Sequence, residues 1–290
     1  MDKKFVTNEI FRINKIIPNE KLGQHFIVNR KYLNLMADGI DKDTIVIEIG
    51  SGFGQLTEAL TIKAKRVIAI EIDKRFKRSL YDLAKKYKKL ELIFDDALKV
   101  PFDKLIDKKL IRRGRVMVIA NLPYHITEPL FNKMLHYPNI KMRLMVGKKF
   151  GYQAQTKNPE DLHFTSLSFL IRSFYDVNQI CEIPKSAFNP QPKTDSMILD
   201  FLPKKMNLDD KVDFLCRGLF LFQKYGTQVK NALMNNIISR SRMLDETLTK
   251  NMARDIVRNL NIPEEILQKP FSQLSNDEIR ILSSKLDKMN

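Results

Sequence analysis

The chain has 290 residues, 43% of them hydrophobic, which is enough for one large α/β domain and a smaller second one. Its 50 Lys and Arg against 34 Asp and Glu give a net charge of +16, which favours a polyanionic partner, nucleic acid before membrane. Short apolar runs exclude a membrane span, and the two cysteines and four histidines show no metal-ligand spacing, so we expect no metal.

Apolar, β-branched runs alternate with helical patterns through the first two hundred residues. Strands are predicted at 44–49, 66–72, 90–94, 116–120, 141–146, 177–183 and 197–202. Helices are predicted between them, for example at 55–65, 74–87 and 129–137. This alternation is typical of βαβ units and predicts an α/β fold with a mostly parallel sheet and helices on both faces. Only a loop separates the last two strands, which predicts an antiparallel pair at the sheet edge.

The pattern changes after Pro203. From about Leu208 onward the sequence shows amphipathic helices and no strand candidate, and the segment 203–209 reads as a linker. We therefore predict a first domain over 1–203, with an N-terminal extension over 1–21, and a helical second domain over 204–290.

The basic residues are clustered along the chain. They gather at 63–66, 74–78, 85–89, 108–115 and 148–149. In a lysine-rich protein such runs could simply be solvated helix faces without a partner. The clustering favours a nucleic-acid partner over that alternative.

A glycine-rich turn follows the first predicted strand. It contains Gly50, Gly52 and Gly54, and glycines at such a turn let the backbone bend tightly and approach a ligand closely. The Gly-x-Gly-x-Gly spacing differs from the Gly-x-Gly-x-x-Gly of the dinucleotide fingerprint.

Carboxylates accompany the first three strands. Glu71 ends the second, where an acid can accept both hydroxyls of a ribose, and Asp95 and Asp96 follow the third, where a carboxylate could accept an adenine amino group. Glu48 precedes the loop and could orient it or balance sulfonium and ammonium charges. A nicotinamide or flavin site remains an alternative, but these acids fit S-adenosylmethionine better.

Asn121-Leu122-Pro123-Tyr124 ends the fourth predicted strand. Asn121 offers a carbonyl oxygen to an N–H, and Tyr124 offers a face for stacking. Pro123 fixes its own φ and favours an extended Leu122, which holds the intervening carbonyl in one direction. The segment could grip a flat base that carries an exocyclic amine, although a proline turn with a structural tyrosine would look the same.

Six segments together resemble the ribosomal RNA adenine N6-dimethyltransferase family, which includes the small-subunit dimethyltransferases and the macrolide-resistance enzymes. They occur in the family's order at 22–27, 48–54, 71–73, 96–97, 121–124 and 186–196. The resemblance implies a Rossmann-like, class I S-adenosylmethionine-dependent methyltransferase with a seven-stranded, mostly parallel sheet. It also implies that the first domain is catalytic and that the helical domain binds RNA.

The resemblance also implies roles for individual residues. Asn121, Leu122, Pro123, Tyr124 and Phe188 would form the catalytic set, with Phe188 stacking on the base opposite Tyr124, unless it only packs in the core. The implied cofactor contacts are Gln24, His25, Ile27, Glu48, Gly50, Gly52, Gly54, Glu71, Ile72, Asp96, Ala97 and Asn121.

The C-terminal tail resembles the archaeal and eukaryotic small-subunit branch, more loosely than the rest. One segment departs from that branch, which usually has Gln-Lys-Glu after the fifth strand, where this chain has Gly147-Lys148-Lys149. The change removes an acid near the active site and adds positive charge. It leaves the conformation of this loop, and the choice of RNA target, open.

The expected reaction methylates N6 of adenines in small-subunit ribosomal RNA, with a role in ribosome biogenesis and dimethylation as its outcome. Hydrogen bonds to the Asn121 side chain and the Leu122 carbonyl would favour a pyramidal N6, and the base must be single-stranded or flipped to reach them. Two alternatives remain: methylation of large-subunit ribosomal RNA, as the resistance enzymes do, and a non-catalytic ribosome-assembly or nucleic-acid-binding factor. The intact motifs argue against the second.

Two further expectations concern the protein's surroundings. The N-terminus, 1–5, lacks a following apolar stretch, which argues against secretion, and the widely separated Cys181 and Cys216 suit a reducing compartment. We therefore expect a cytoplasmic protein. Nothing in the sequence suggests an obligate dimer, so we expect a monomer.

Overall fold

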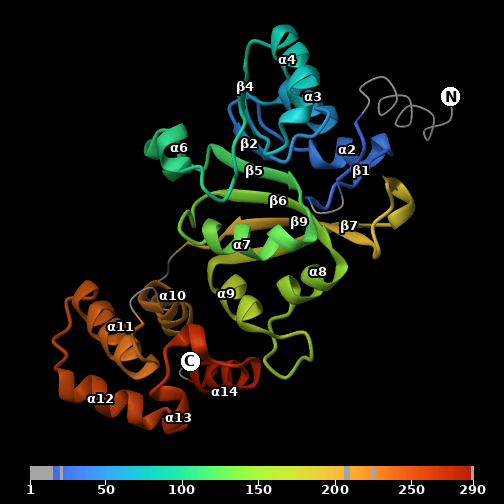
Figure 1. Ribbon diagram of the computed structural model, residues 1–290. Coiled ribbons are helices and arrows are strands. Elements are labelled where there is room, and N and C mark those ends of the chain that lie inside the picture. Colours follow the sequence, from blue (N-terminus) through green and yellow to red (C-terminus); the bar gives the residue numbers. More distant parts are fainter. Residues whose placement is uncertain (1–15, 20–21, 206–209, 224–225, 289–290) are drawn as a thin grey trace. The chain divides into compact units, whose positions relative to one another are not determined.

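The computed structural model describes residues 16–19, 22–205, 210–223 and 226–288 (Figure 1). Most of the predicted N-terminal extension and the end of the predicted linker, 206–209, lie outside the described residues. The chain divides into two compact units, one of Met1–Gly151 with Val177–Pro203 and one of Tyr152–Asp176 with Lys204–Asn290. Within the described residues, no helix is long and apolar enough to cross a membrane.

The first unit is built on a seven-stranded sheet with the order β4-β3-β2-β5-β6-β9-β7. Its strands are β2 (Ile45–Ile49), β3 (Arg66–Ile70), β4 (Leu90–Ile93), β5 (Val116–Asn121), β6 (Lys141–Gly147), β7 (Tyr175–Ile183) and β9 (Ser196–Pro203). Neighbours from β4 to β6 run parallel, and β9 runs antiparallel to β6. The predicted mostly parallel seven-stranded sheet is confirmed.

The burial of the strands accounts for the apolar, β-branched runs from which they were predicted. All five residues of β2 are buried, as expected for a central parallel strand covered on both faces. The last two predicted strands, β7 and β9, are neighbours as expected, with β7 at the edge.

Helices cover the sheet between the strands. They are α2 (Arg30–Met36), α3 (Gln55–Lys63), α4 (Lys77–Lys86), α5 (Phe102–Leu105), α6 (Lys108–Arg112), α7 (Tyr124–Met134) and α8 (Lys148–Gln155), with a short 3₁₀ turn, η2 (Lys74–Phe76), before α4. α3 packs on β3, α4 on β4 and α7 on β6. The sequence pattern predicted α7 from 129, but the helix begins at Tyr124, directly after Pro123, and keeps Pro129 inside it.

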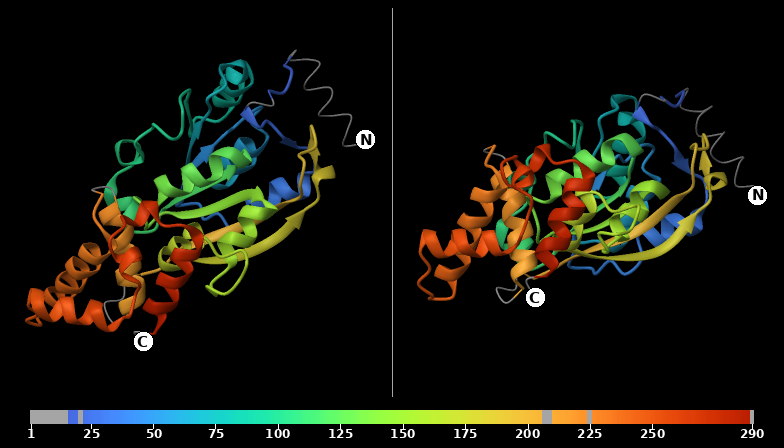
Figure 2. Two further views of the ribbon diagram at one scale, coloured as in Figure 1. Left: turned by 60° about the horizontal axis from the view of Figure 1, so that its bottom comes forward. Right: turned by 90° about the horizontal axis from the view of Figure 1, so that it is seen from below.

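A second, two-stranded sheet joins distant parts of the chain. β1 (Phe26–Ile27) pairs antiparallel with β8 (Phe188–Asn189), which follows a 3₁₀ turn, η3 (Lys185–Ala187). Figures 1 and 2 show this turn region, in yellow, beside the blue N-terminal segment. The pairing brings the 22–27 and 186–196 motifs together, which the sequence alone did not predict.

The second unit is helical. It contains α9 (Ser166–Phe174), α10 (Lys211–Gln223), α11 (Val229–Met243), α12 (Lys250–Asn259), α13 (Glu264–Leu267), a 3₁₀ turn, η4 (Phe271–Gln273), and α14 (Asn276–Asp287). The segment 152–176, predicted as part of the first domain, is grouped with this unit. The reason is α9, which packs against α10 and α14 and whose Arg172 forms an ion pair with Asp287, 2.9 Å between Nη2 and Oδ1.

Candidate active site

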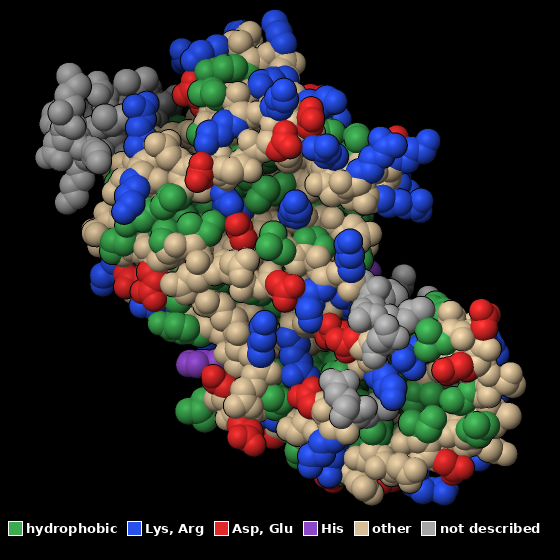
Figure 3. All heavy atoms as spheres, turned by 180° about the vertical axis from the view of Figure 1, so that it is seen from behind, with side chains coloured by type: hydrophobic (Ala, Val, Ile, Leu, Met, Phe, Trp, Pro, Cys, Tyr) green, Lys and Arg blue, Asp and Glu red, His purple; other side chains and the backbone are tan. Residues whose placement is uncertain are grey.

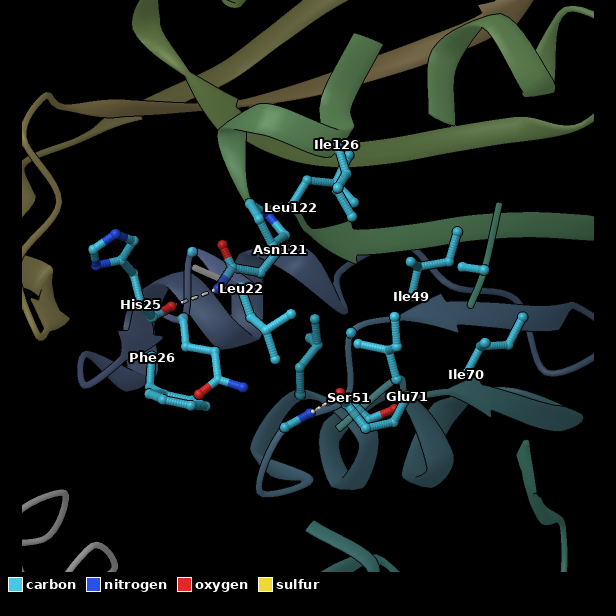
Figure 4. A pocket seen from close by; sticks show the side chains of 18 of the residues that line it. Leu22, His25, Phe26, Ile49, Ser51, Ile70, Glu71, Asn121, Leu122 and Ile126 are labelled. Atoms are coloured by element: carbon cyan, nitrogen blue, oxygen red, sulfur yellow. Dashed lines mark hydrogen bonds between the residues drawn. The ribbon is translucent and has the colours of Figure 1, made fainter. Parts of the chain in front are cut away.

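A cavity in the first unit lies at the carboxyl ends of β2, β3 and β5, the edge at which ligands bind in open α/β sheets (Figure 4). It brings together most of the residues that the sequence singled out. These are Gln24, His25, Ile27, Gly50, Gly52, Glu71, Ile72, Asp96, Ala97, Asn121, Leu122, Pro123, Tyr124 and Phe188. Glu48 and Gly54 are predicted site residues that do not line it.

The glycine-rich turn has the conformation that its sequence requires. Gly50, Gly52 and Gly54 have φ values of 77°, 52° and 88°, in the left-handed region that other residues rarely adopt. A Cβ on Gly52 would lie 2.9 Å from Cε1 of Phe26, and one on Gly54 would lie 3.1 Å from Cδ2 of Leu83. The absence of a side chain at Gly54 thus lets the turn pack against α4, and its absence at Gly52 lets the turn lie close to Phe26.

Glu71 braces this loop from the neighbouring strand. Its Oε2 accepts a hydrogen bond from the Gly52 amide over 2.7 Å, and its Oε1 accepts one from the Asp73 amide over 2.8 Å. Burial raises the pKa of Glu71, and these amide donors partly offset that effect. A carboxylate has about four lone-pair sites, so Glu71 retains capacity to accept hydroxyl groups.

Glu48 has a different environment. It is fully buried, and neither carboxylate oxygen has a hydrogen-bond partner of good geometry in the described part of the chain. Burial raises the pKa of Glu48 to about 8, with the nearby Thr57 hydroxyl opposing and Glu71 adding to the rise. The sequence suggested that Glu48 might orient the loop, but the hydrogen bond that braces the loop comes from Glu71.

Gln24 and His25 form the N-terminal wall of the cavity. Gln24 donates from Nε2 to Oδ2 of Asp73 over 2.7 Å, which ties this segment to the end of β3. His25 donates from Nδ1 to the Pro190 carbonyl over 2.8 Å. Both contacts cross large sequence separations, and they tie the segment to the end of β3 on one side and to the 186–196 motif on the other.

The Asn121–Tyr124 segment joins β5 to α7 at the opposite wall. Asn121 donates from Nδ2 to the His25 carbonyl over 3.1 Å, drawn as a dashed line in Figure 4. The Leu122 amide donates to the Met145 carbonyl over 3.1 Å, which fixes the peptide that follows Asn121 to β6. This bond fixes how the Asn121 amide is turned, and its carbonyl oxygen is the atom that can accept a ligand's N–H.

The two predicted base-stacking rings have unequal surroundings. Tyr124 is 39% exposed and donates from its hydroxyl to the Thr194 carbonyl over 3.2 Å. Phe188 is 4% exposed, and it belongs to a core cluster that also contains Ile27 and Ile198. Phe188 still lines the cavity. Its stacking role stays a prediction beside the core-packing role that the structure gives it.

The remaining predicted contacts lie at the ends of β3 and β4. Ile72 is 53% exposed and presents an apolar surface to the cavity. Asp96 accepts the Leu98 amide at Oδ1 over 2.9 Å, an arrangement that fixes the turn after β4. Both positions suit recognition of a nucleoside, and both roles stay predictions.

An aromatic cluster that was not predicted from the sequence lies beside the glycine-rich turn. Phe26, Phe53 and Phe76 all line the cavity, and their ring centroids lie 4.8 to 5.8 Å apart. Phe26 lies in the 22–27 motif and Phe53 in the 48–54 motif, and their place in these motifs could have indicated that they line the site. Among the described residues, no group of three or more His, Cys, Asp or Glu side chains could hold a metal ion.

Comparisons with known proteins agree with this geometry. Residues 17–265 match the family described as "Ribosomal RNA adenine dimethylase". A ribosomal RNA small subunit methyltransferase A from Clostridium acetobutylicum is 34% identical over 96% of this chain and 100% of its own length, and one from Oceanobacillus iheyensis is 31% identical over 89% of each.

Solved structures give the same picture. A dimethyladenosine transferase from Plasmodium falciparum has a TM-score of 0.60 and 26% identity, covering 91% of this chain and 98% of that one. The 23S rRNA methyltransferase ErmE has a TM-score of 0.55 at 18% identity, covering 90% and 99%, a likeness of fold. The relatives named here with an organism are two bacterial proteins and one from Plasmodium falciparum. The resemblance of the C-terminal tail to the archaeal and eukaryotic branch therefore stays a prediction.

Proposed function

This chain belongs to the ribosomal RNA adenine dimethylase family, and on that premise we propose that it methylates N6 of adenine in small-subunit ribosomal RNA, twice on each target base. The observation that carries the proposal is the Asn121 side chain. Its nitrogen is held by the His25 carbonyl, and Asn121 and Leu122 both line the cavity. The amide oxygen is thereby positioned to accept a hydrogen bond from an exocyclic amine.

The residues of the cavity fit S-adenosylmethionine as the cofactor. A glycine turn that excludes side chains would receive its methionine portion, and Glu71 would accept the ribose hydroxyls. Asp96, Ile72 and Ala97 would hold its adenine ring. When bound, S-adenosylmethionine supplies an activated methyl group, so the protein needs to provide position and electrostatics more than acid–base chemistry.

The chain's own residues would orient the target base. An adenine flipped out of its RNA would stack on Tyr124, which is partly exposed at the cavity. The Asn121 oxygen and the Leu122 carbonyl would accept the two N6 hydrogens, which directs the nitrogen lone pair. The surplus proton on the methylated nitrogen is acidic and can leave to solvent, so no dedicated general base is required.

The surface charge supports an RNA substrate. The net charge of +16 suits contacts to phosphates, and Lys and Arg side chains are spread over the face shown in Figure 3, with Asp and Glu among them. We infer that the helical unit grips structured RNA and that the substrate is a precursor of the small ribosomal subunit in the cytoplasm, bound by a monomer.

One experiment tests these assignments together. The protein is incubated with radiolabelled S-adenosylmethionine and with each unmodified ribosomal subunit, and modified adenines are located by mass spectrometry. We expect dimethyladenine in the small-subunit RNA. Label confined to the large subunit would support the resistance-type activity instead, and absence of label with retained RNA binding would support a non-catalytic assembly factor.

A further inference from the structure

Gly147, the last residue of β6, lies directly against the Tyr124 ring. A Cβ added to Gly147 would lie 3.1 Å from Cδ1 of Tyr124 and 3.2 Å from its Cγ and Cε1. Those distances are shorter than ordinary van der Waals contact, so any side chain at this position would press on the ring. Gly147 is not among the residues that line the cavity, whereas Tyr124 is. The glycine therefore lies against the ring without itself lining the cavity.

The backbone itself does not require a glycine here. Gly147 is not one of the residues with positive φ, and it continues β6 in regular pairing with β9. Alanine could adopt this conformation without backbone strain. The space taken by the Tyr124 ring is the feature that glycine provides.

The tip of the same ring is held by the strand opposite. The Tyr124 hydroxyl lies 3.0 Å from Oγ of Ser196 and donates to the Thr194 carbonyl over 3.2 Å. Gly147 and Ser196 are direct partners in the β6–β9 ladder. One cross-strand pair thus contacts the ring at two points, its face through Gly147 and its hydroxyl through Ser196.

The start of α8, which directly follows Gly147, is fixed as well. The Lys148 amide donates to the Asp195 carbonyl over 3.1 Å, and Lys148 Nζ forms an ion pair with Oε2 of Glu182 at 2.8 Å. The extra positive charge of this segment is therefore partly neutralised by an acid on β7. Neither Gly147 nor its flanking backbone is free to retreat from the ring.

We propose that Gly147 is a positioning residue for the target base: it lets the Tyr124 ring lie against the β6 backbone while Ser196 holds its hydroxyl, and so sets the plane on which the adenine stacks. This inference rests on the proposed function, in which Tyr124 receives the base. A side chain at 147 would move the ring by a few tenths of an ångström or break its bond to Ser196. Either change would tilt or narrow the stacking site without touching the cofactor side.

The test compares Gly147→Ala with the wild type. We expect kcat for methyl transfer to fall roughly 3- to 10-fold for Gly147→Ala, since a 1 Å misplacement can cost about 10²-fold. Cofactor affinity by calorimetry and the unfolding temperature should stay close to the wild-type values. Lys141→Ala, an exposed change at the other end of β6, is the matched control and should leave kcat unchanged.

A double-mutant cycle separates positioning from a general structural effect. Tyr124→Phe removes the hydroxyl anchor, so the ring can shift freely, and Gly147→Ala should cost less in that background than in the wild type. Additive losses, or a wild-type kcat for Gly147→Ala, would overturn the proposal. Failure of the proposed function would look different, because the wild-type protein would then transfer no methyl group to adenine.

Discussion

Asn121 Nδ2 and the carbonyl oxygen of His25 are 3.1 Å apart across a separation of 96 residues, and this bond joins the two walls of the cavity. It decides which end of the Asn121 amide faces a ligand. Because the bond fixes how the amide is turned, its oxygen, the acceptor of the group, is held ready for an amine N–H. The bond also explains why an N-terminal motif and the 121–124 motif belong to one site.

Replacing Asn121 with Ala should therefore abolish most of the methyl transfer. Loss of one preorganised polar contact at a reacting group costs about 10²- to 10³-fold in rate. Single-turnover assays with saturating cofactor and RNA would measure this loss. Cofactor and RNA affinities should fall far less than the rate, as Glu71 and the glycine turn are untouched. A rate within threefold of the wild type would show that Asn121 does not orient the base.

Much of this site followed from the sequence because its parts obey local rules. A buried parallel strand, a Gly-x-Gly-x-Gly turn and an acid at the end of the next strand are each written in consecutive residues. The sheet then brings Gly52 and Glu71 together, because β2 and β3 are parallel neighbours in register. The family resemblance indicated that these segments, which occur along the chain in the family's order, contribute to one site.

Other features depend on long-range contacts that no local pattern encodes. The β1–β8 pairing, the Arg172–Asp287 ion pair that places α9 with the C-terminal helices, and the burial of Phe188 all join segments far apart in sequence. The environment of Glu48 was likewise not predictable from its neighbours in sequence. Its position before the loop suggested a ligand contact, but β2 is a central strand covered on both faces, so Glu48 is enclosed in the interior whichever face it points to.

The second prediction concerns Gly52, where conformation and space act together. Gly52→Ala would strain a residue at φ 52° and bring its Cβ to 2.9 Å from the Phe26 ring, so the loop must shift. We expect cofactor affinity to fall at least tenfold in calorimetric titrations.

Gly39→Ala is the matched control for this change. Gly39 has a similar φ of 64°, but nothing lies within 4 Å of its Cβ position. The Gly39→Ala variant should lose about 1–2 kcal/mol of stability, because alanine is strained in the left-handed conformation, and should keep the wild-type cofactor affinity. Equal losses of affinity in both variants would mean that backbone strain, and not the space beside Phe26, is responsible.

The third prediction concerns the pH dependence of stability. The pKa of Glu48 is raised from its ordinary 4.5 to about 8 by burial, so the unfolded chain releases this proton at lower pH than the folded protein does. Its effect on stability is absent below the unfolded value and becomes increasingly unfavourable as pH rises from about 4.5 to about 8. Each unit in that window corresponds to about 1.4 kcal/mol at most.

Glu48→Gln keeps the shape of the side chain and removes the titration. Urea unfolding at pH 5 and at pH 8 should show the variant gaining stability relative to the wild type at the higher pH. A difference between the two proteins that is the same at both pH values would mean that Glu48 does not titrate in this window.

The last prediction concerns the basic helix α6. Lys108, Lys109, Arg112 and Arg113 are exposed, and within the described residues no acidic side chain forms an ion pair with any of them. The nearest acid on the helix, Asp107, accepts the Lys109 amide as the N-cap. These four charges therefore remain available for phosphates, and changing all four to Gln should raise the KM for RNA while kcat stays the same.

The salt dependence of binding gives the sharper measurement. Each phosphate contact adds about 0.7 (single strands) to about 0.9 (duplex) to the slope of log affinity against log salt concentration, so the α6 variant, with four charges removed, should lose up to roughly 3 to 3.5 units of slope. The matched control is Lys85→Gln with Lys86→Gln on α4, whose charges are already paired with Asp82 and Glu58 at 3.3 and 2.7 Å. A smaller change per charge is expected there, because those lysines would have to give up an acidic partner to reach a phosphate. If both variants altered the slope equally per charge removed, the net charge of the protein alone would account for RNA affinity, and α6 would have no particular contact.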